Sequence, residues 1–264
     1  MKTKQILKIL VFSWLELIIF NPCEAQEWMM RAYIVEKSAE SPASDCFAPS
    51  FAGVRFRNDF GTKEMMFTYA EGMLALRKNR LLFSVTHYGY AKYGEMKLSV
   101  GYGRNFGDRF AMTARIFYLM AHARDYPTKH SLCTDFAIAC RVSPKLLFDA
   151  TVYNPFMMRY GIVDQDVIPL KFSIGCTYTP VRKLLFSLSM SKELPGGWVV
   201  DCRFMTQPVP PLLLAVDCSN LRLGICVGWQ FRRFLISAQA TWHYRIAISP
   251  EIGGFYFQED SNKR

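Results

Sequence analysis

Three polar residues near the middle of the chain are of the types that nucleophilic catalysis uses. Ser131 carries a hydroxyl, His122 is a possible base, and Asp125 has a carboxylate that could orient that base. Such chemistry requires all three groups within hydrogen-bond reach of one another. No sequence signature fixes that geometry here, and a histidine in a polar loop is more often simply solvated. We therefore predict that the protein is not an enzyme and has no catalytic residues.

The eight cysteines show no metal-binding or disulfide pattern. Cys23 belongs to the N-terminal leader described below. The seven others include no C-x-x-C and have no histidine nearby at ligand spacing. An odd number without such spacing argues against both a disulfide framework and a zinc site. We predict no metal and no cofactor.

Charged residues occur inside otherwise apolar segments, where they alternate with the apolar residues. Between positions 95 and 103, for example, Glu95 and Lys97 alternate with Met96, Leu98 and Val100. A period of two is that of a β-strand, whose successive side chains point to opposite faces. The polar face of the predicted sheet carries Glu95, Lys97, Asp135, Arg141, Asp149, Lys171, Asp201, Arg203, Arg222 and Arg232.

Fourteen predicted strands must position these residues. They cover residues 50–58, 64–76, 80–90, 93–105, 109–122, 129–142, 145–153, 168–179, 183–192, 198–206, 210–218, 221–231, 233–244 and 248–257. Most approach the length that a tilted strand needs to cross hydrocarbon. Alternation alone would also fit a soluble sandwich. Aromatic residues near the strand ends favour a membrane barrel with interfacial girdles, and we expect Tyr102, Tyr178, Trp198, Trp229 and Trp242 at these interfaces.

A basic-Leu-Leu-Phe phrase occurs three times, each time at a polar turn. The copies are Arg80–Phe83, Lys145–Phe148 and Lys183–Phe186. If the barrel has an even number of strands and both ends lie in the periplasm, parity places every copy at the periplasmic rim. The longest connection, 154–169, then falls outside. We interpret the phrase as part of the scaffold, in which a cation meets lipid headgroups and Leu-Leu-Phe begins the path into hydrocarbon.

The chain begins in the way that exported proteins begin. Three lysines precede an apolar run over residues 9–20, and the small-residue site Cys23-Glu24-Ala25 follows. The run is too short to span a bilayer, so the pattern predicts a signal peptide over residues 1–25. A lipoprotein cysteine at Cys23 and an uncleaved anchor are the alternatives. Cleavage would take the net charge from +10 to +9, and no later segment is apolar enough for a transmembrane helix.

The remaining chain reads as one domain with two short flanking segments. We predict an all-β, transmembrane, antiparallel up-and-down barrel of about 14 strands (12–16) over residues 50–257. Residues 26–49 would form an N-terminal periplasmic segment or a plug, and residues 258–264 a polar C-terminal tail. The ten charged residues would then line the lumen. Because both signs occur, the lumen could be a salt-bridged wall or a selective pore.

Several short motifs together carry a resemblance to a known family. From Arg80 to Phe257 the chain resembles the outer-membrane barrels of Bacteroidetes-type bacteria that are similar to fourteen-stranded FadL-type transporters and to type IX secretion-associated barrel proteins. The motifs are Lys97-Leu98-Ser99-Val100-Gly101-Tyr102-Gly103, Asn105-Phe106-Gly107-Asp108, Lys129-His130-Ser131, Ser143-Pro144-Lys145-Leu146-Leu147, Tyr153-Asn154-Pro155, Ile168-Pro169, Ser191-Lys192-Glu193, Trp242-His243-Tyr244 and Ser249-Pro250. The chain is shorter than the transporters and lacks their glycine-rich N-terminal segment.

The resemblance implies two functions. The first is a porin-like conduit for small, hydrophobic molecules. The alternative is a non-enzymatic structural or docking component of a type IX-like secretion apparatus, with other envelope proteins as partners. In either case outer-membrane lipids surround the barrel. Nucleic acid is not an expected partner, because the basic residues form no patch interleaved with stacking aromatic residues.

Overall fold

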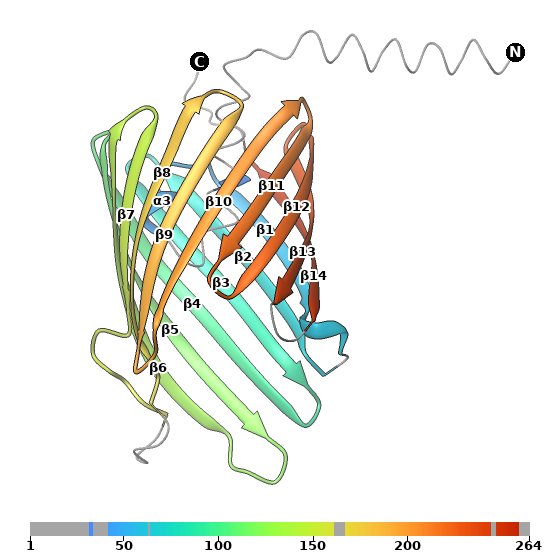
Figure 1. Ribbon diagram of the computed structural model, residues 1–264. Coiled ribbons are helices and arrows are strands. Elements are labelled where there is room, and N and C mark those ends of the chain that lie inside the picture. The colour runs from blue at the N-terminus through green and yellow to red at the C-terminus, as the bar shows by residue number, and fades with distance from the viewer. Residues whose placement is uncertain (1–31, 34–41, 63, 161–166, 244–246, 259–264) are drawn as a thin grey trace, which may run out of the picture.

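The computed structural model describes residues 32–33, 42–62, 64–160, 167–243 and 247–258, and it is a closed antiparallel β-barrel (Figure 1). The predicted fold class is therefore confirmed. The predicted signal peptide and the tail after Gln258 lie outside the described residues. The fourteen strands are β1 (Phe51–Asn58), β2 (Met66–Leu76), β3 (Asn79–Tyr90), β4 (Tyr93–Phe106), β5 (Phe110–Ala123), β6 (Lys129–Ser143), β7 (Leu146–Tyr153), β8 (Leu170–Val181), β9 (Leu184–Leu194), β10 (Trp198–Val209), β11 (Leu212–Ser219), β12 (Arg222–Phe231), β13 (Phe234–His243) and β14 (Ile248–Phe257).

Each strand pairs with its neighbours in sequence, and the first strand pairs with the last. In that closing seam Phe51 lies opposite Phe257, and Arg57 lies opposite Glu251. Closure removes the unpaired backbone groups that an open sheet presents at its edges. Among the described residues, no helix has the length and apolar character needed to cross a bilayer.

The two ends of the barrel differ. At one end, which we call the turn rim, the chain enters at Phe51 and leaves at Phe257, and six short turns join β2–β3, β4–β5, β6–β7, β8–β9, β10–β11 and β12–β13. The other end, the loop rim, carries the 154–169 connection. There the wall is uneven, because β4, β5 and β6 have 14, 14 and 15 residues whereas β11 has 8. In Figure 1 these long strands extend well below the short ones.

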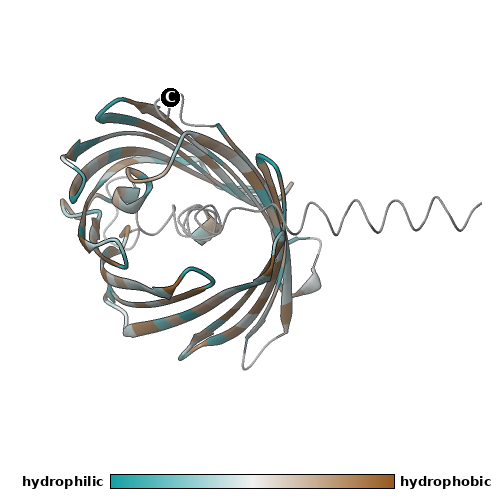
Figure 2. Cartoon of the chain, turned by 90° about the horizontal axis from the view of Figure 1, so that it is seen from above, coloured by the Kyte–Doolittle hydropathy of each residue, from teal (hydrophilic) through white to brown (hydrophobic). Residues whose placement is uncertain are grey.

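The outer face of the barrel is apolar along its whole girth. Val100 is 71% exposed, and Ile116, Ile174 and Ile252 are about 60% exposed. A continuous apolar band of this kind is normal only where lipid or a partner covers it. Figure 2 shows the alternation of apolar and polar residues along the strands.

The five predicted interfacial aromatic residues are all exposed. Tyr102, Tyr178 and Trp229 lie toward the turn rim, and Trp198 and Trp242 lie at the loop-rim ends of their strands.

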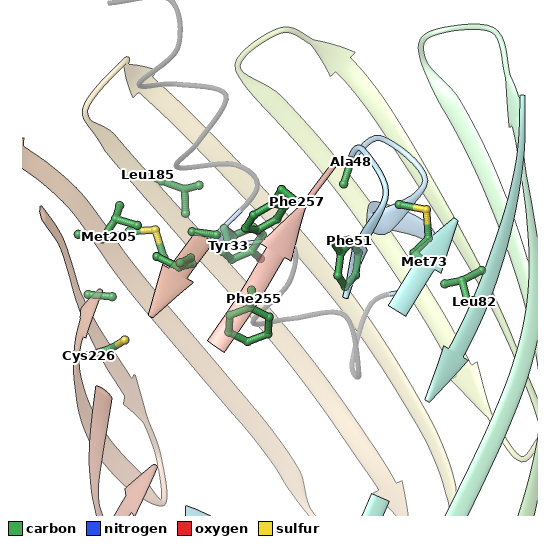
Figure 3. Packing of buried hydrophobic residues seen from close by; sticks show 14 residues of the cluster. Tyr33, Ala48, Phe51, Met73, Leu82, Leu185, Met205, Cys226, Phe255 and Phe257 are labelled. Atoms are coloured by element: carbon green, nitrogen blue, oxygen red, sulfur yellow. The ribbon is translucent and has the colours of Figure 1, made fainter. Parts of the chain in front are cut away.

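The interior near the turn rim is apolar, which the sequence pattern did not lead us to expect. Fourteen buried residues from the wall and the N-terminal segment form one cluster, here called the lumenal apolar cluster. Side chains such as Phe255, Phe257 and Met205 point into it (Figure 3). The Phe255 ring covers Gly53, where an added Cβ would lie 2.1 Å from a ring carbon. Glycine at position 53 therefore makes room for the ring.

The repeated phrase contributes to this interior as well as to the outer face. Leu82 and Leu185 are 5% and 0% exposed, whereas Phe83 and Phe186 are 46% and 44% exposed. Successive side chains on a strand point to opposite faces, so the second leucine of each copy points inward. The phrase serves both faces of the wall.

The described residues of the 26–49 segment lie inside the barrel. Helix α3 (Pro42–Asp45) is buried and contacts β5, β6 and β7. The Cys46 carbonyl accepts hydrogen bonds from Arg80 at 3.1 Å and Asn105 at 2.8 Å. Deeper inside, the Tyr33 hydroxyl is hydrogen-bonded to Ser187 at 2.5 Å and accepts from Thr177 at 2.9 Å. These bonds anchor the segment to opposite parts of the wall.

Shortening Phe255 to alanine should destabilise the barrel more than the same change on the outer face. Phe255→Ala opens a void in the lumenal apolar cluster, which typically costs about 3–5 kcal/mol. Phe56→Ala, on an outward-facing residue that is 49% exposed, is the matched control. Urea unfolding of lipid-reconstituted protein, followed by tryptophan fluorescence, measures both. An equal loss in the two variants would contradict a packed interior.

Candidate functional site: the lumen at the loop rim

The charged residues predicted to line the lumen fall into three groups. Asp201, Arg203 and Arg222 line one cavity, and Glu95 and Lys97 line another. A third group lies along β6 to β8. On β6, Asp135 accepts hydrogen bonds from Arg115, and Arg141 stacks on Phe47 of the N-terminal segment. Asp149 on β7 lies next to Gly175, and Lys171 on β8 is the cross-strand partner of Glu193. Arg232 departs from the prediction.

Arg232 lies in the turn between β12 and β13, where it is exposed. Its φ of 50° is a turn conformation that interrupts the strand. Its guanidinium carbon lies 5.8 Å from the ring centroid of Phe231, which is 61% exposed on the outer face. The alternation of β12 therefore ends one residue before Arg232.

Ion pairs cross-link the wall at mid-height. Arg115 donates to both carboxylate oxygens of Asp135, at 2.5 Å for the shortest bond, and both side chains are buried. Arg55 bonds Glu71 at 3.3 Å, and the Tyr69 hydroxyl donates to Glu71 at 2.9 Å. Buried charges remain ionised only when they are paired in this way. Arg115 was not among the ten residues predicted to line the lumen, although the alternation of β5 places it on the same inward face as Thr113.

A charged cavity of about 210 Å³ occupies the side of the lumen formed by β9 to β14 and β1. Its arginines are paired: Arg203 bonds Asp217 in a bidentate arrangement with one bond of 2.7 Å, and Arg222 lies 3.5 Å from Asp201. Arg57 bonds Asp59 at 2.7 Å at the boundary with the second cavity. Positive and negative groups alternate over short distances, so this side of the lumen is strongly polar without favouring one sign.

The second cavity, here called the aromatic vestibule, has a volume of about 770 Å³. It lies at the loop rim, on the side of the barrel formed by the long strands β4 to β6. Its lining combines aromatic rings with apolar side chains. The aromatic residues are Phe67, Tyr88, Tyr93, Tyr126, Tyr153 and Tyr160, and the apolar ones include Leu119, Ile168 and Pro169. Two of the lining residues, Leu119 and Ile168, also belong to a buried cluster with Phe117 and Cys133. A cavity of this size and lining suits a small organic molecule.

The N-terminal segment places a carboxyl group under these cavities. Asp45 is 2% exposed, and its Oδ1 atom has no hydrogen-bond partner among the described residues. Burial raises the pKa of Asp45 well above its usual value, and the charges of Glu71 and Asp149 add to the rise while Arg115 and Arg55 oppose it. Next to it, burial raises the pKa of Cys46 to about 12, so this thiol stays protonated.

The three residues considered for catalysis are not assembled. Ser131 is the register partner of the inward-facing Leu119, so the alternation puts His122 on the opposite face. The Ser131 hydroxyl donates to the backbone carbonyl of Arg159 at 2.7 Å. Asp125 lies in the following turn with a φ of 70°. The arrangement therefore lacks the contacts that a catalytic triad requires.

A closed ring of fourteen antiparallel strands, with an apolar outer face and an N-terminal segment inside, defines a β-barrel of the outer-membrane type. Solved structures of outer-membrane channels share the fold. The CymD monoaromatic hydrocarbon channel matches with a TM-score of 0.64 and 6% identity over 85% of this chain and 93% of that one. The P. putida toluene transporter TodX matches with 0.64 and 8% identity over 84% and 93%.

A Pseudomonas aeruginosa FadL homologue matches with a TM-score of 0.61 and 7% identity, over 84% of this chain and 93% of that one. At such identities the likeness concerns the fold. No protein-family model matches the chain, and no curated protein matches it. The predicted resemblance to FadL-type barrels is confirmed as a likeness of fold, while the links to Bacteroidetes-type bacteria and to type IX secretion stay predictions.

Replacing Asp45 by asparagine should remove a pH dependence from the seating of the N-terminal segment. Because the folded-state pKa of Asp45 is raised, its contribution to stability is fully present below the ordinary carboxyl pKa of about 4 and is lost as pH rises through the folded value. Amide hydrogen exchange in peptides covering residues 42–50 should therefore accelerate with pH more in the natural protein than in Asp45→Asn. Comparing both at each pH cancels the intrinsic exchange rate, and identical profiles would contradict the expectation.

Proposed function

We propose that the protein is a conduit for small hydrophobic molecules in the bacterial outer membrane. The aromatic vestibule carries this proposal, because it is a cavity of about 770 Å³ with aromatic and apolar walls at the mouth of the barrel. The structural neighbours support it, since two of them are described as a monoaromatic hydrocarbon channel and a toluene transporter. The apolar outer face suits insertion in a membrane.

In this proposal the loop rim faces the outside and the turn rim faces the periplasm. Short periplasmic turns and longer outer connections are usual for such barrels. The basic turns carrying Lys78, Lys145 and Lys183 would then contact headgroups from the inner side. Tyr102, Tyr178 and Trp229 would lie at the inner interface, and Trp198 and Trp242 at the outer one.

The N-terminal segment would act as a plug. Below the vestibule, α3 and the lumenal apolar cluster occupy part of the interior. A solute that enters from the loop rim therefore meets packed side chains on the direct path to the turn rim. Passage requires this packing to open, while the ion-paired wall keeps the barrel closed around it.

A bulky residue inside the vestibule should block uptake. Ala121 lines the vestibule, whereas Ala114 lies on the outer face of the same strand. We expect Ala121→Trp to reduce toluene uptake to the level of cells without the protein, and Ala114→Trp to leave it unchanged. The assay follows labelled toluene into a bacterial host that has a lipopolysaccharide outer leaflet and no hydrocarbon channel of its own.

Two outcomes of this assay would contradict the proposal. One is equal uptake by cells with and without the natural protein. The other is uptake that survives Ala121→Trp at the natural level, with both variants present in the membrane in equal amount.

A further inference from the structure

Lys97 is a partly buried cation on the wall of the aromatic vestibule. Its ammonium nitrogen lies 4.1 Å from the ring centroid of Phe117 and 4.3 Å from that of Tyr153. The two rings meet edge to face, with centroids 5.5 Å apart. The side chain of Lys97 is thus held in one place by two aromatic rings.

The described residues give Lys97 no carboxylate partner. No ion pair within the described ranges includes it, and the acids nearest in the pattern of the wall are engaged elsewhere. Asp135 is held by Arg115 in a bidentate pair, and Glu95 accepts a hydrogen bond from the Tyr93 hydroxyl. A partly desolvated ammonium without a paired carboxylate is costly, so pairing with Lys97 would stabilise an anion in the vestibule.

Tyr153 supplies a second donor at the same place. The Cys133 thiol donates to the Tyr153 hydroxyl oxygen at 3.2 Å, so the hydroxyl hydrogen of Tyr153 remains available for an acceptor in the vestibule. An ammonium and a phenol side by side match the two oxygens of a carboxylate. Both residues line the vestibule.

The rest of the cavity sets the shape of the ligand. The walls carry the rings of Tyr88, Tyr93, Tyr126 and Tyr160, which favour contact with another aromatic ring. The cavity volume of about 770 Å³ suits a small organic molecule. We propose that the vestibule binds small aromatic carboxylates, with the carboxylate on Lys97 and Tyr153 and the ring among the tyrosines.

This inference rests on the proposed function, since it names the class of solute that the vestibule prefers. Benzoate and its uncharged analogue benzamide are the probes, and calorimetry on the full-length chain in detergent at pH 7 measures their affinities. We expect benzoate to bind about tenfold more tightly than benzamide, as a charge-assisted hydrogen bond would give.

Lys97→Met should abolish this preference, since methionine keeps the length of the side chain and removes the charge. Lys145→Met removes a lysine that is exposed at the turn rim, away from the vestibule, and should leave the preference intact. Equal affinities for benzoate and benzamide in the natural protein would overturn the inference, even where Lys97→Met fails to fold. A preference that survives in folded Lys97→Met would also overturn it.

The two proposals can fail separately. If the protein raises toluene uptake but does not prefer benzoate to benzamide, the proposed conduit is supported and the proposed carboxylate site is contradicted. If benzoate binding depends on Lys97 but the protein does not raise toluene uptake, the proposed carboxylate site is supported and the proposed conduit is contradicted.

Discussion

The pairing of β1 with β14 is the constraint on which the other features depend. Once Phe51 and Phe257 lie opposite each other, every strand has two partners and every side chain must face either the surroundings or the lumen. A ring of about eight strands is filled by its own side chains, whereas wider rings leave space. The fourteen strands therefore enclose a volume that the wall alone does not fill, and the N-terminal segment occupies part of it.

The lumen is divided into levels with different chemistry. The level near the turn rim is apolar, and its free energy comes from burying side chains such as Met73, Leu235 and Phe255. The mid-level is ion-paired, and near the loop rim the charged cavity faces the aromatic vestibule. A polar solute and an apolar one thus meet different surfaces at the same mouth, and Arg57 and Asp59 lie on the boundary between them.

Strand positions were largely predictable because alternation is a local property of the chain. The predicted strands 221–231 and 233–244 differ by one residue at their ends from Arg222–Phe231 and Phe234–His243. β10 continues to Val209, beyond the predicted end at 206, because a register shift between Thr206 and Val209 accommodates Pro208.

The contents of the lumen were less predictable, because they depend on contacts between distant segments. Leu82 and Leu185 belong to a phrase that we assigned to the membrane-facing scaffold, yet both point inward. The charged groups that act on Asp45 come from β1, β2, β5 and β7, and nothing near Asp45 in the sequence indicates them. The contact of the Lys97 ammonium with the rings of Phe117 and Tyr153 likewise depends on three strands, β4, β5 and β7.

The position of the N-terminal segment also bears on the order of folding. The segment comes before β1, and the ring closes only when β14, at the far end of the chain, pairs with β1. Contacts between such distant parts of a chain form slowly. The segment must reach its place before that seam forms or enter through the turn rim afterwards, so insertion of the barrel and enclosure of its contents are kinetically coupled.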